Sequence, residues 1–519
     1  MTCRRCWPER GADLGEGAFS SALIAENAVQ RDIAVIDVGS NSVRLVHFRL
    51  EGPALWPVYN EKVMAGLGMG VRKTGRLNPD GVDLALRALK RFQRLLDAKG
   101  VHERYVVATA AVRNADDGPD FIRKARKLTG LLTRVLSGEE EGEMSAIGLL
   151  AGIPGAHGMT GDLGGSSLEL TPLTKGVAGE GRTFALGPQE VIGQAWDYAK
   201  ARKKIDERLK EADFSGCEGQ TFYAVGGAWR ALAQMAFARG DHPLRVVHGF
   251  SMETREIRPL TRLVAGMSEA SLVATPGVSR RRAATMPYAA LLLRRLLKHG
   301  RFARVVFSAY GLREGVILAS QAEELRAQDP LVAGAEALAR PVSPTPGFGA
   351  ALGRWMRPLM KATPVAFSPL RDRILEETAA RLADLGARLH PDHRVDLARD
   401  SVLYAPFAGV THPERVFLAA MIHHRYGGSR SAFETLDVEG LITDDQLDVA
   451  QVIGMTLRLG AKLSGRSEKL LKRFKLSTPD GYVRLDIDES VHDLYVERSV
   501  SLLDQIAEVL GRQAQVVYA

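Results

Sequence analysis

The chain has 519 residues, 45% of them hydrophobic and 25% charged, which is typical of a globular protein of two to four domains. No apolar run approaches the roughly 20 residues of a membrane-spanning helix, and the first residues lack the charged-then-apolar order of a secretory signal. Three cysteines are too few for a disulfide framework. We therefore expect a soluble cytoplasmic protein without stable membrane association.

The net charge of +8 suits nucleic acid or a polyanionic small substrate equally well. The densest basic patches are residues 280–282 and 294–301. Residues 290–293 are apolar, so the second patch is interpreted as the solvated face of a helix. No aromatic residues interleave with either patch, which argues against single-stranded nucleic acid. We expect no nucleic-acid partner.

Residues 1–30 have no clear periodicity, which predicts a flexible tail. Within this tail, Cys3 and Cys6 have a spacing found in redox and zinc sites, but no second pair accompanies them. The tail is therefore not expected to carry a site.

An apolar run over residues 33–38 leads into a turn of small residues, and residues 44–50 then alternate polar and apolar. This pattern predicts a tight hairpin. Backbone N–H groups and hydroxyls at its tip would suit a phosphate, and an aspartate beside it would suit magnesium. Read alone, the same turn could simply join two strands. The residues concerned are Asp37 ahead of the turn and Gly39, Ser40, Asn41 and Ser42 within it.

Helices and strands alternate after this hairpin. Asn78 and Pro79 form a helix start, and Gly100 ends that helix. A strand, a helix, a strand and a helix are then predicted over residues 105–108, 119–128, 131–136 and 139–150.

Two stretches in this region carry charges of interest. Arg113 follows the strand at 105–108, and its planar guanidinium fits phosphate oxygens. Glu139, Glu140 and Glu141 stand together at a helix start. Acids there can simply stabilise the positive end of the helix, or one of them can take a proton from water. The pattern leaves both interpretations open.

The hairpin pattern appears a second time over residues 161–169. Further strands are predicted over 221–225 and 304–308, each leading into a glycine-containing turn and a helix. Such turns allow close approach of a nucleotide base or a phosphate. Two units of this kind predict a duplicated α/β fold with a cleft between its halves. The residues singled out are Asp162, Gly164, Gly165, Ser166, Ser167 and Glu169 in the second hairpin and Gly226 and Gly227 in the later turn.

The character of the chain changes after residue 330. Pro341, Pro344 and Pro346 mark a linker, and helical periods follow over 372–388 and 412–424. A strand, a helix and a strand are predicted over 482–486, 500–510 and 516–518. The last third is thus expected to be a helical domain with a small α/β end piece.

These motifs, taken in order, resemble the exopolyphosphatase and guanosine pentaphosphate phosphohydrolase (Ppx/GppA) family, within the actin, sugar-kinase and Hsp70-like superfamily. The resemblance covers residues 31–320. It rests on the two hairpins, the Ala108–Arg113 and Ser137–Glu141 segments, the Val225–Gly227 turn and the Tyr310–Gly315 turn.

The resemblance implies a fold of two duplicated ribonuclease-H-like (actin-like) α/β domains with an interdomain cleft. The first would span 31–153 and the second 154–325. A helical domain related to HD-type phosphohydrolases would follow over 326–478, and a small α/β subdomain over 479–519. The HD domain is expected to have a degenerate metal site and to serve as a platform that lengthens a basic channel and helps to form a homodimer.

The resemblance also implies removal of the terminal phosphate from inorganic polyphosphate, with Mg²⁺ or Mn²⁺. Glu141 would polarise the attacking water, and Glu169 would orient it or bind metal. Asp37 and Asp162 would face the metal, and Arg113 would hold the terminal phosphate. Further donors would come from Gly39, Ser40, Asn41, Ser42, Gly164, Gly165, Ser166, Ser167, Gly226 and Gly227.

Two departures from the family pattern stand out. Ser166 replaces a usual glycine and Leu168 a usual threonine, so a Cβ could crowd the phosphate, or the Ser166 hydroxyl could add a donor. In the helical domain, Ala383 and Asp384 stand where an HD site has His-Asp, and no complete ligand pattern accompanies His390, His393, His423 and His424.

Alternative functions remain. Hydrolysis of guanosine pentaphosphate (pppGpp) to ppGpp would use the same residues, and both activities could coexist in one enzyme. A non-catalytic sensor of polyphosphate or alarmone is less favoured because Glu141 and Glu169 are intact. A sugar kinase is least favoured, because the Ser-Gly-x-Glu-Glu motif belongs to the hydrolase branch.

Overall fold

The computed structural model describes residues 30–192, 196–240, 242–275, 278–436, 438–494 and 497–518. The chain divides into two compact units, which meet in the sequence between Gln328 and Asp329. Cys3 and Cys6 lie outside the described residues. Within the described ranges, no helix is both long and apolar enough to cross a membrane.

The first sheet has the strand order β3-β2-β1-β4-β5. Strands β1, β2 and β3 are antiparallel neighbours, whereas β1, β4 and β5 run parallel. The strands are β1 (Arg31–Val38), β2 (Val43–Glu51), β3 (Ala54–Val63), β4 (Glu103–Ala108) and β5 (Thr133–Val135), and the helices are α2 (Val71–Thr74), α3 (Pro79–Ala98), α4 (Ala110–Arg113), α5 (Gly118–Thr129) and α6 (Gly138–Gly152).

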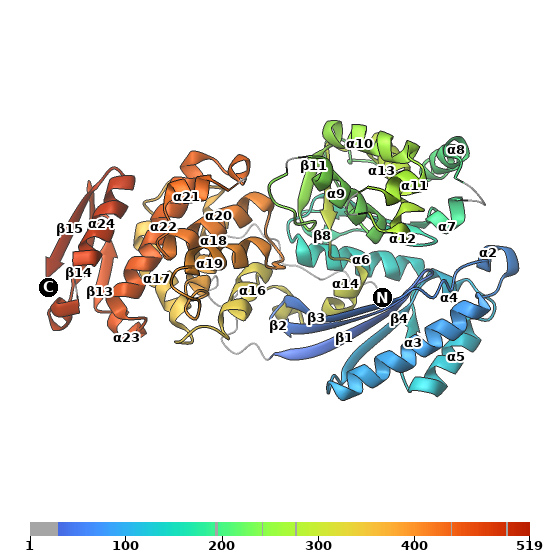
Figure 1. Cartoon of the computed structure of the whole chain (residues 1–519), viewed down its shortest axis with the longest axis horizontal. Helices are drawn as coiled ribbons and strands as arrows, with labels where there is room; N and C mark the ends of the chain where they lie inside the picture. Colours follow the sequence, from blue (N-terminus) through green and yellow to red (C-terminus); the bar gives the residue numbers. More distant parts are fainter. Residues whose placement is uncertain are drawn as a thin grey trace. The chain divides into compact units, whose positions relative to one another are not determined.

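Both faces of strand β1 are buried, as its uninterrupted apolar run requires. Ala34 and Ile36 pack into the cluster that includes Phe92 of α3. Ile33 and Val35, on the other face, pack with Ile317 of helix α14 (Leu312–Ala319). Figure 1 shows α3 and α5 on one side of this sheet and α6 and α14 on the other.

The second sheet repeats the first. Its order is β11-β12-β10-β6-β7-β8, with β9 also paired to β7. Strand β6 is antiparallel to β7 and parallel to β10, which is parallel to β12. The first three strands of each sheet thus form an antiparallel meander, and β4 and β5 in the first sheet and β10 and β12 in the second join in parallel beside the first strand, whereas β11 pairs antiparallel with β12. The duplicated ribonuclease-H-like fold expected from the sequence is confirmed.

The elements of this second half follow the predicted order. The strands are β6 (Gly158–Leu163), β7 (Leu168–Thr174), β8 (Val177–Ala178), β9 (Arg182–Phe184), β10 (Thr221–Val225), β11 (Phe250–Glu253) and β12 (Arg304–Ser308), and the helices before α14 are α7 (Pro188–Val191), α8 (Tyr198–Leu209), α9 (Gly227–Arg239), α10 (Thr254–Gly266), α11 (Glu269–Val273), α12 (Arg280–Ala283) and α13 (Met286–His299).

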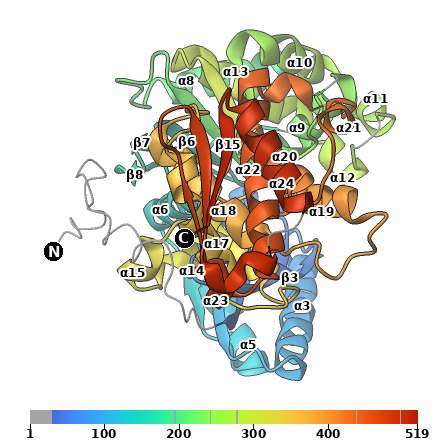
Figure 2. The same cartoon turned by 90° about the vertical axis from the view of Figure 1, so that its left-hand side faces the viewer.

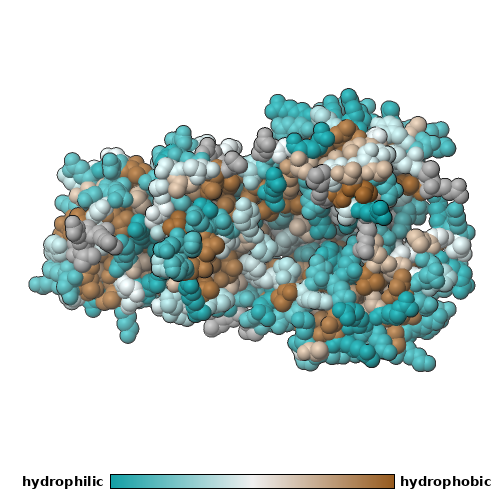
Figure 3. Space-filling model, in the orientation of Figure 1, coloured by the Kyte–Doolittle hydropathy of each residue, from teal (hydrophilic) through white to brown (hydrophobic). Residues whose placement is uncertain are grey.

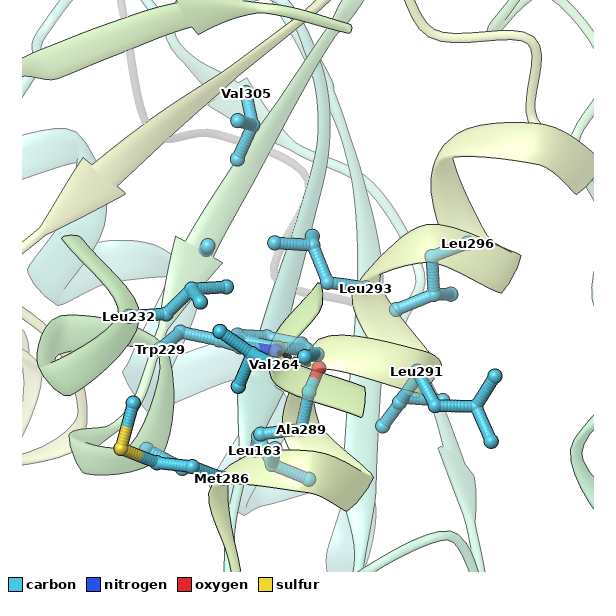
Figure 4. Close-up of a cluster of buried hydrophobic side chains, with 14 of the residues drawn as sticks. Leu163, Trp229, Leu232, Val264, Met286, Ala289, Leu291, Leu293, Leu296 and Val305 are labelled. Atoms are coloured by element: carbon cyan, nitrogen blue, oxygen red, sulfur yellow. Dashed lines mark hydrogen bonds between the residues drawn. The ribbon is translucent and has the colours of Figure 1, made fainter. Parts of the chain in front are cut away.

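Helix α13 passes through the core of the second half. Leu291, Leu293 and Leu296 are completely buried, and Figure 4 shows them beside Trp229 of α9 and Val264 of α10. The Trp229 Nε1–H donates to the Ala289 carbonyl at 2.9 Å, which satisfies its polar atom inside the core.

Two glycines allow helices α6 and α14 to pack closely. A Cβ at Gly148 would lie 1.9 Å from the Gly311 carbonyl oxygen, and one at Gly315 would lie 1.7 Å from that of Met144. Helix α14 comes from the end of the second α/β segment, yet it packs on α6 and β1. Because the chain returns in this way, the start of α14 and the start of α6 line the same region.

The second unit is mainly helical, with a three-stranded sheet of order β13-β14-β15. Helix α24 packs beside this sheet (Figures 1 and 2). Helix α15 (Glu323–Arg326) ends the first unit. The elements of the second unit are α16 (Pro330–Ala339), α17 (Phe348–Met360), α18 (Pro369–Leu382), α19 (Arg394–Tyr404), α20 (His412–Arg425), α21 (Arg430–Glu434), α22 (Asp444–Ser464), α23 (Glu468–Leu471), β13 (Phe474–Ser477), β14 (Tyr482–Ile487), α24 (Glu497–Val509) and β15 (Gln513–Tyr518).

The groups considered for a second metal site have other partners here. Asp384 lies 3.0 Å from Arg466 and 3.8 Å from Arg425. One ring nitrogen of His423 contacts the Ser429 carbonyl at 2.9 Å, and one of His424 contacts the Gly428 carbonyl at 3.0 Å. That this unit has a degenerate metal site stays a prediction.

Candidate functional site

The two hairpins have the same geometry. The Gly39 N–H donates to the Ser42 carbonyl, and the Gly164 N–H donates to the Ser167 carbonyl, both at 3.0 Å. The flanking residues also correspond, because Asp37 is opposite Arg44 and Asp162 is opposite Glu169. The same scaffold therefore carries an acid and a cation in one copy and two acids in the other.

The tips of the two hairpins touch. The Ser166 Oγ lies 2.9 Å from the Ser40 Oγ and 3.1 Å from the Gln189 Oε1. Ser166 does not adopt a positive φ, so its Cβ causes no backbone strain. The sequence left two possibilities for Ser166, a crowding Cβ or an added hydrogen-bond donor. In the structure its hydroxyl is a donor, and its partners are protein groups.

A cavity of about 200 Å³ lies at these tips. The starts of α9 and α14 also line it. It brings together most of the predicted site residues, namely Asp37, Gly39, Ser40, Asn41, Ser42, Glu141, Asp162, Gly164, Gly165, Ser166, Ser167, Gly226 and Gly227.

The three acids at the start of α6 have separate roles in the structure. Glu140 forms a capping box: its Oε2 accepts from the Ser137 N–H at 2.8 Å, and the Ser137 Oγ accepts from the Glu140 N–H at 3.1 Å. Glu139 is exposed. Glu141 is only 8% exposed and lines the cavity. Capping therefore accounts for Glu140 and leaves Glu141 for the site.

The acids at the site are held in unusual electrostatic surroundings. Burial raises the pKa of Glu141 to about 7, with Asp162 and Asp37 adding to the rise and Arg113 opposing it. Burial also raises the pKa of Glu169, as do the charges of Glu141 and Asp162. The pKa of Asp162 is raised by burial despite a 2.5 Å hydrogen bond from the Ser145 hydroxyl.

Two predicted residues are placed behind the cavity wall. Glu169 does not line the cavity, and its Oε1 is buried with no hydrogen-bond partner among the described residues. Arg113 does not line it either. Its Nη1 donates to the Leu136 carbonyl at 2.6 Å and to the Glu141 Oε2 at 3.3 Å. Arg113 thus contacts Glu141, and the phosphate contact expected from the sequence stays a prediction.

Cations also line the cavity, and the sequence had not indicated a role for them. Among the described residues they are Arg44, Lys62, Arg230, Arg282 and Arg313. Burial and the nearby guanidinium groups of Arg313 and Arg230 lower the pKa of Arg44 to about 10. Burial also lowers the pKa of Arg230 to about 10. Cations that lower one another's pKa favour binding of a multiply charged anion.

A sequence signal existed for some of these cations. Arg44, Arg230 and Arg313 each lie in or beside a motif already noted. Arg313 approaches Asp37 at 3.1 Å. Lys62 had no such signal, and it reaches the site because β3 pairs with β2 so that Lys62 is opposite Arg44.

Of the paired glycines at the start of α9, Gly226 is required by its backbone conformation and a close backbone contact, whereas Gly227 faces only the flexible end of Arg282. Gly226 has φ of 121°, and a Cβ there would lie 2.7 Å from the Leu163 carbonyl oxygen. A Cβ at Gly227 would lie 2.2 Å from the Arg282 Nη2. These glycines let the second hairpin and Arg282 approach the helix start.

The donor set suits magnesium bound jointly with phosphate. Within the described ranges, no three acidic, histidine or cysteine side chains form a metal cage. Mg²⁺ is usually held by one or two carboxylates together with substrate phosphates and waters. Asp37 and Asp162 line the cavity, and the Glu169 Oε1 behind them lacks a partner. These residues fit such an arrangement.

Duplicated ribonuclease-H-like halves around a basic, acid-containing cavity define a phosphate-handling protein of the actin-like fold. Comparison of the sequence with family models gives the particular family. Residues 46–324 match the Ppx/GppA phosphatase family, and residues 346–517 match the model "Exopolyphosphatase, C-terminal". The chain belongs to the Ppx/GppA phosphatase family.

Individual relatives agree with this assignment. The chain is 25% identical over 301 residues to "Exopolyphosphatase 1" of Mycobacterium tuberculosis, covering 55% of this chain and 87% of that protein. It is 25% identical over 305 residues to the protein of the same name from Mycobacterium leprae, covering 55% and 88%. The crystal structure of an exopolyphosphatase from Cytophaga hutchinsonii superposes with a TM-score of 0.51 at 22% identity, covering 56% of this chain and 97% of that one. This last likeness supports the fold alone.

Proposed function

We propose that the protein is an exopolyphosphatase, which hydrolyses the terminal phosphoanhydride bond of inorganic polyphosphate and releases orthophosphate. The observation that carries the proposal is the presence of a buried acid, Glu141, in the same cavity as five cations. Phosphoryl transfer depends mainly on positioning and on neutralising charge, and this cavity provides for both.

Substrate binding would use the cations and the hairpin tips. Arg44, Arg230 and Arg282 would neutralise phosphate oxygens, and the backbone N–H groups of the tips would position the terminal phosphoryl group. Because the tips contact each other through Ser40 and Ser166, the phosphate would lie in the cavity beside them.

Glu141 would act as the general base. Its carboxylate would accept a proton from water as the water oxygen attacks the terminal phosphorus, and the bond to the bridging oxygen would break with its electron pair leaving on the shortened chain. A base with a pKa near neutrality combines the ionised form with adequate basicity. Arg113 would hold the Glu141 carboxylate in position.

Mg²⁺ or Mn²⁺ belongs to the proposal as well. Asp37 and Asp162, with Glu169 nearby, would hold it, and when bound it would offset the negative charge of the phosphates. Loss of phosphate release on addition of EDTA, with recovery on addition of excess Mg²⁺, would support this part. A homodimer and a cytoplasmic location are further expectations, which light scattering and cell fractionation would check.

The decisive experiment compares phosphate release from long-chain polyphosphate and from guanosine pentaphosphate. It uses the wild type, Glu141→Gln and, as a matched control, Glu139→Gln, which changes an exposed acid two residues away. We expect release from polyphosphate by the wild type and the control, with kcat lower by about 10²–10⁴-fold in Glu141→Gln.

Faster release from the nucleotide would instead favour the alternative function, a guanosine pentaphosphate phosphohydrolase, which would use the same residues. Release from neither substrate, with tight binding retained, would favour a non-catalytic sensor of polyphosphate or alarmone.

A further inference from the structure

A second basic cavity lies in the α/β unit, away from the hairpin tips. Its volume is about 310 Å³, and helices α8, α10 and α13 line it. Six of its lining residues are cations, namely Arg202, Arg258, Arg262, Arg294, Arg295 and Lys298. The surface at the upper edge of the molecule, around α10, is largely hydrophilic (Figure 3). We call this cavity the α10–α13 cavity.

Most of these cations have no acidic partner. Among the described residues, Arg258, Arg262, Arg294 and Lys298 form no ion pair with a carboxylate. Arg294 donates from Nη1 to the Tyr198 hydroxyl at 3.2 Å. Four positive charges without a carboxylate partner thus line one cavity. Arg258, Arg262 and Lys298 are exposed, so the cavity is open to solvent, and its charge favours an anion.

The remaining two cations share a single acid at the cavity's edge. The Asp206 Oδ1 accepts from the Arg295 Nε at 2.5 Å and contacts the His299 Nε2 at 3.1 Å, and its Oδ2 lies 3.8 Å from the Arg202 Nε. Asp206 does not itself line the cavity. The acid therefore fixes Arg295 in place and leaves the net charge of the cavity positive.

Helix α13 connects the two cavities. Tyr288, in its first turn, lines the cavity at the hairpin tips, and Lys298, in its last turn, lines the α10–α13 cavity. Ten residues separate them, which is about 15 Å along a helix. The core packing of α13 holds this separation fixed.

We propose that the α10–α13 cavity is a second anion site, which binds an internal stretch of the phosphate chain whose end is cut at the hairpin tips. Binding of a phosphate chain by the cavity requires no hydrolysis, whereas its use for substrate rests on the proposed function. This assignment replaces the sequence-based interpretation of residues 294–301 as a solvated helix face.

The lining favours an inorganic chain over a nucleotide. Among the described residues that line the cavity, Tyr198 is the only aromatic one, and its hydroxyl accepts a hydrogen bond from Arg294. A nucleotide base gains affinity chiefly by stacking on such rings, and guanidinium groups and a lysine suit phosphoryl oxygens.

The test uses the full chain with Glu141→Gln, which blocks turnover, and measures tripolyphosphate binding by calorimetry. We expect two sites per chain. Adding Arg258→Ser and Arg262→Ser should remove one site. The matched control, Lys203→Ser with Arg255→Ser, removes two exposed cations from α8 and α10 that do not line the cavity, and it should keep both sites.

A second readout uses the same paired substitutions in the active enzyme. We expect KM for long-chain polyphosphate to rise about 10- to 100-fold with Arg258→Ser and Arg262→Ser, while kcat for tripolyphosphate stays unchanged. A single tripolyphosphate site in Glu141→Gln, or equal affinity in all variants, would overturn the proposal. Displacement of the second equivalent by GTP but not by long-chain polyphosphate would overturn the assignment to an inorganic chain.

The two proposals fail in distinguishable ways. If the wild type releases no phosphate from polyphosphate, but one of two tripolyphosphate sites disappears with Arg258→Ser and Arg262→Ser, the second site stands and the proposed function falls. If phosphate is released and the paired substitutions change nothing, the proposed function stands and the second site falls.

Discussion

The Arg113 guanidinium lies 3.3 Å from the Glu141 carboxylate and also donates to the Leu136 carbonyl. This pairing bridges the end of α4 and the start of α6. We therefore predict that Arg113 acts through the proposed base and that its effect on phosphate is indirect.

Arg113→Gln should therefore lower kcat more than it changes KM. We expect kcat to fall by about 10- to 100-fold, because a mispositioned base loses much of its contribution, with KM within about threefold of wild type. Arg113→Lys, which keeps the charge, should recover part of the rate. A large rise in KM with little change in kcat would contradict this and restore the direct phosphate contact.

The lowered pKa of Lys62 predicts that substrate binding depends on pH. Although the residue is exposed as a whole, burial of its ammonium and the nearby Arg282 and Arg44 lower its pKa to about 8. The free enzyme loses this charge as pH rises through 8, and a bound polyanion raises the pKa again. KM should thus increase above pH 8, by up to about tenfold per pH unit.

The matched variant for this effect is Lys62→Arg, because arginine stays charged over the same range. Steady-state kinetics from pH 7 to 9 should show a nearly flat KM for Lys62→Arg. A KM that does not change in the wild type between these pH values would contradict a role for Lys62 in binding.

The Ser166–Ser40 hydrogen bond predicts a modest stability effect. Ser166→Ala should lower the free energy of unfolding by about 0.5–1.5 kcal/mol, the usual net value of such a bond. A double-mutant cycle with Ser40→Ala, followed by urea denaturation, separates the bond from other effects. If the two single effects add fully, the hydroxyl groups do not stabilise each other.

The close packing of α6 and α14 predicts a larger effect. Gly148→Ala would place a Cβ 1.9 Å from the Gly311 carbonyl oxygen, and the resulting overpacking should cost about 1–3 kcal/mol. Activity should fall too, since α6 carries Glu141 and α14 carries Arg313. Gly155→Ala is the control, because a Cβ there meets nothing within 4 Å. Equal melting temperatures for the two variants would contradict this packing.

Local motifs were sufficient to predict both hairpins and the strands at 221–225 and 304–308, because each depends on neighbours in the sequence. They left the role of the acids at 139–141 open, and only the family resemblance singled out Glu141. The strands appear with those bounds in the structure. The cation cluster could not be predicted in this way. Its members come from β2, β3, α9, α12 and α14, and only the folding of distant segments brings them together.

The need for distant segments to meet also explains why two details of the structure could not be predicted from the sequence. The side chain of Arg113 faces Glu141, and that direction depends on how α4 meets α6, which periodicity does not encode. Residues 294–301 have the pattern of a solvated helix face, yet Arg258 and Arg262 of α10 lie across the same cavity. A basic helix face and half of the proposed anion site would have the same sequence pattern.

The duplicated hairpins differ in the charge of the residue opposite the aspartate. In the first, the residue opposite the aspartate is Arg44, and in the second it is Glu169. A phosphate in the cavity would meet Arg44 beside Asp37, whereas Glu169 beside Asp162 lies behind the cavity wall. The repeat is symmetric in backbone but not in charge, so exchanging Arg44 and Glu169 would not give an equivalent protein.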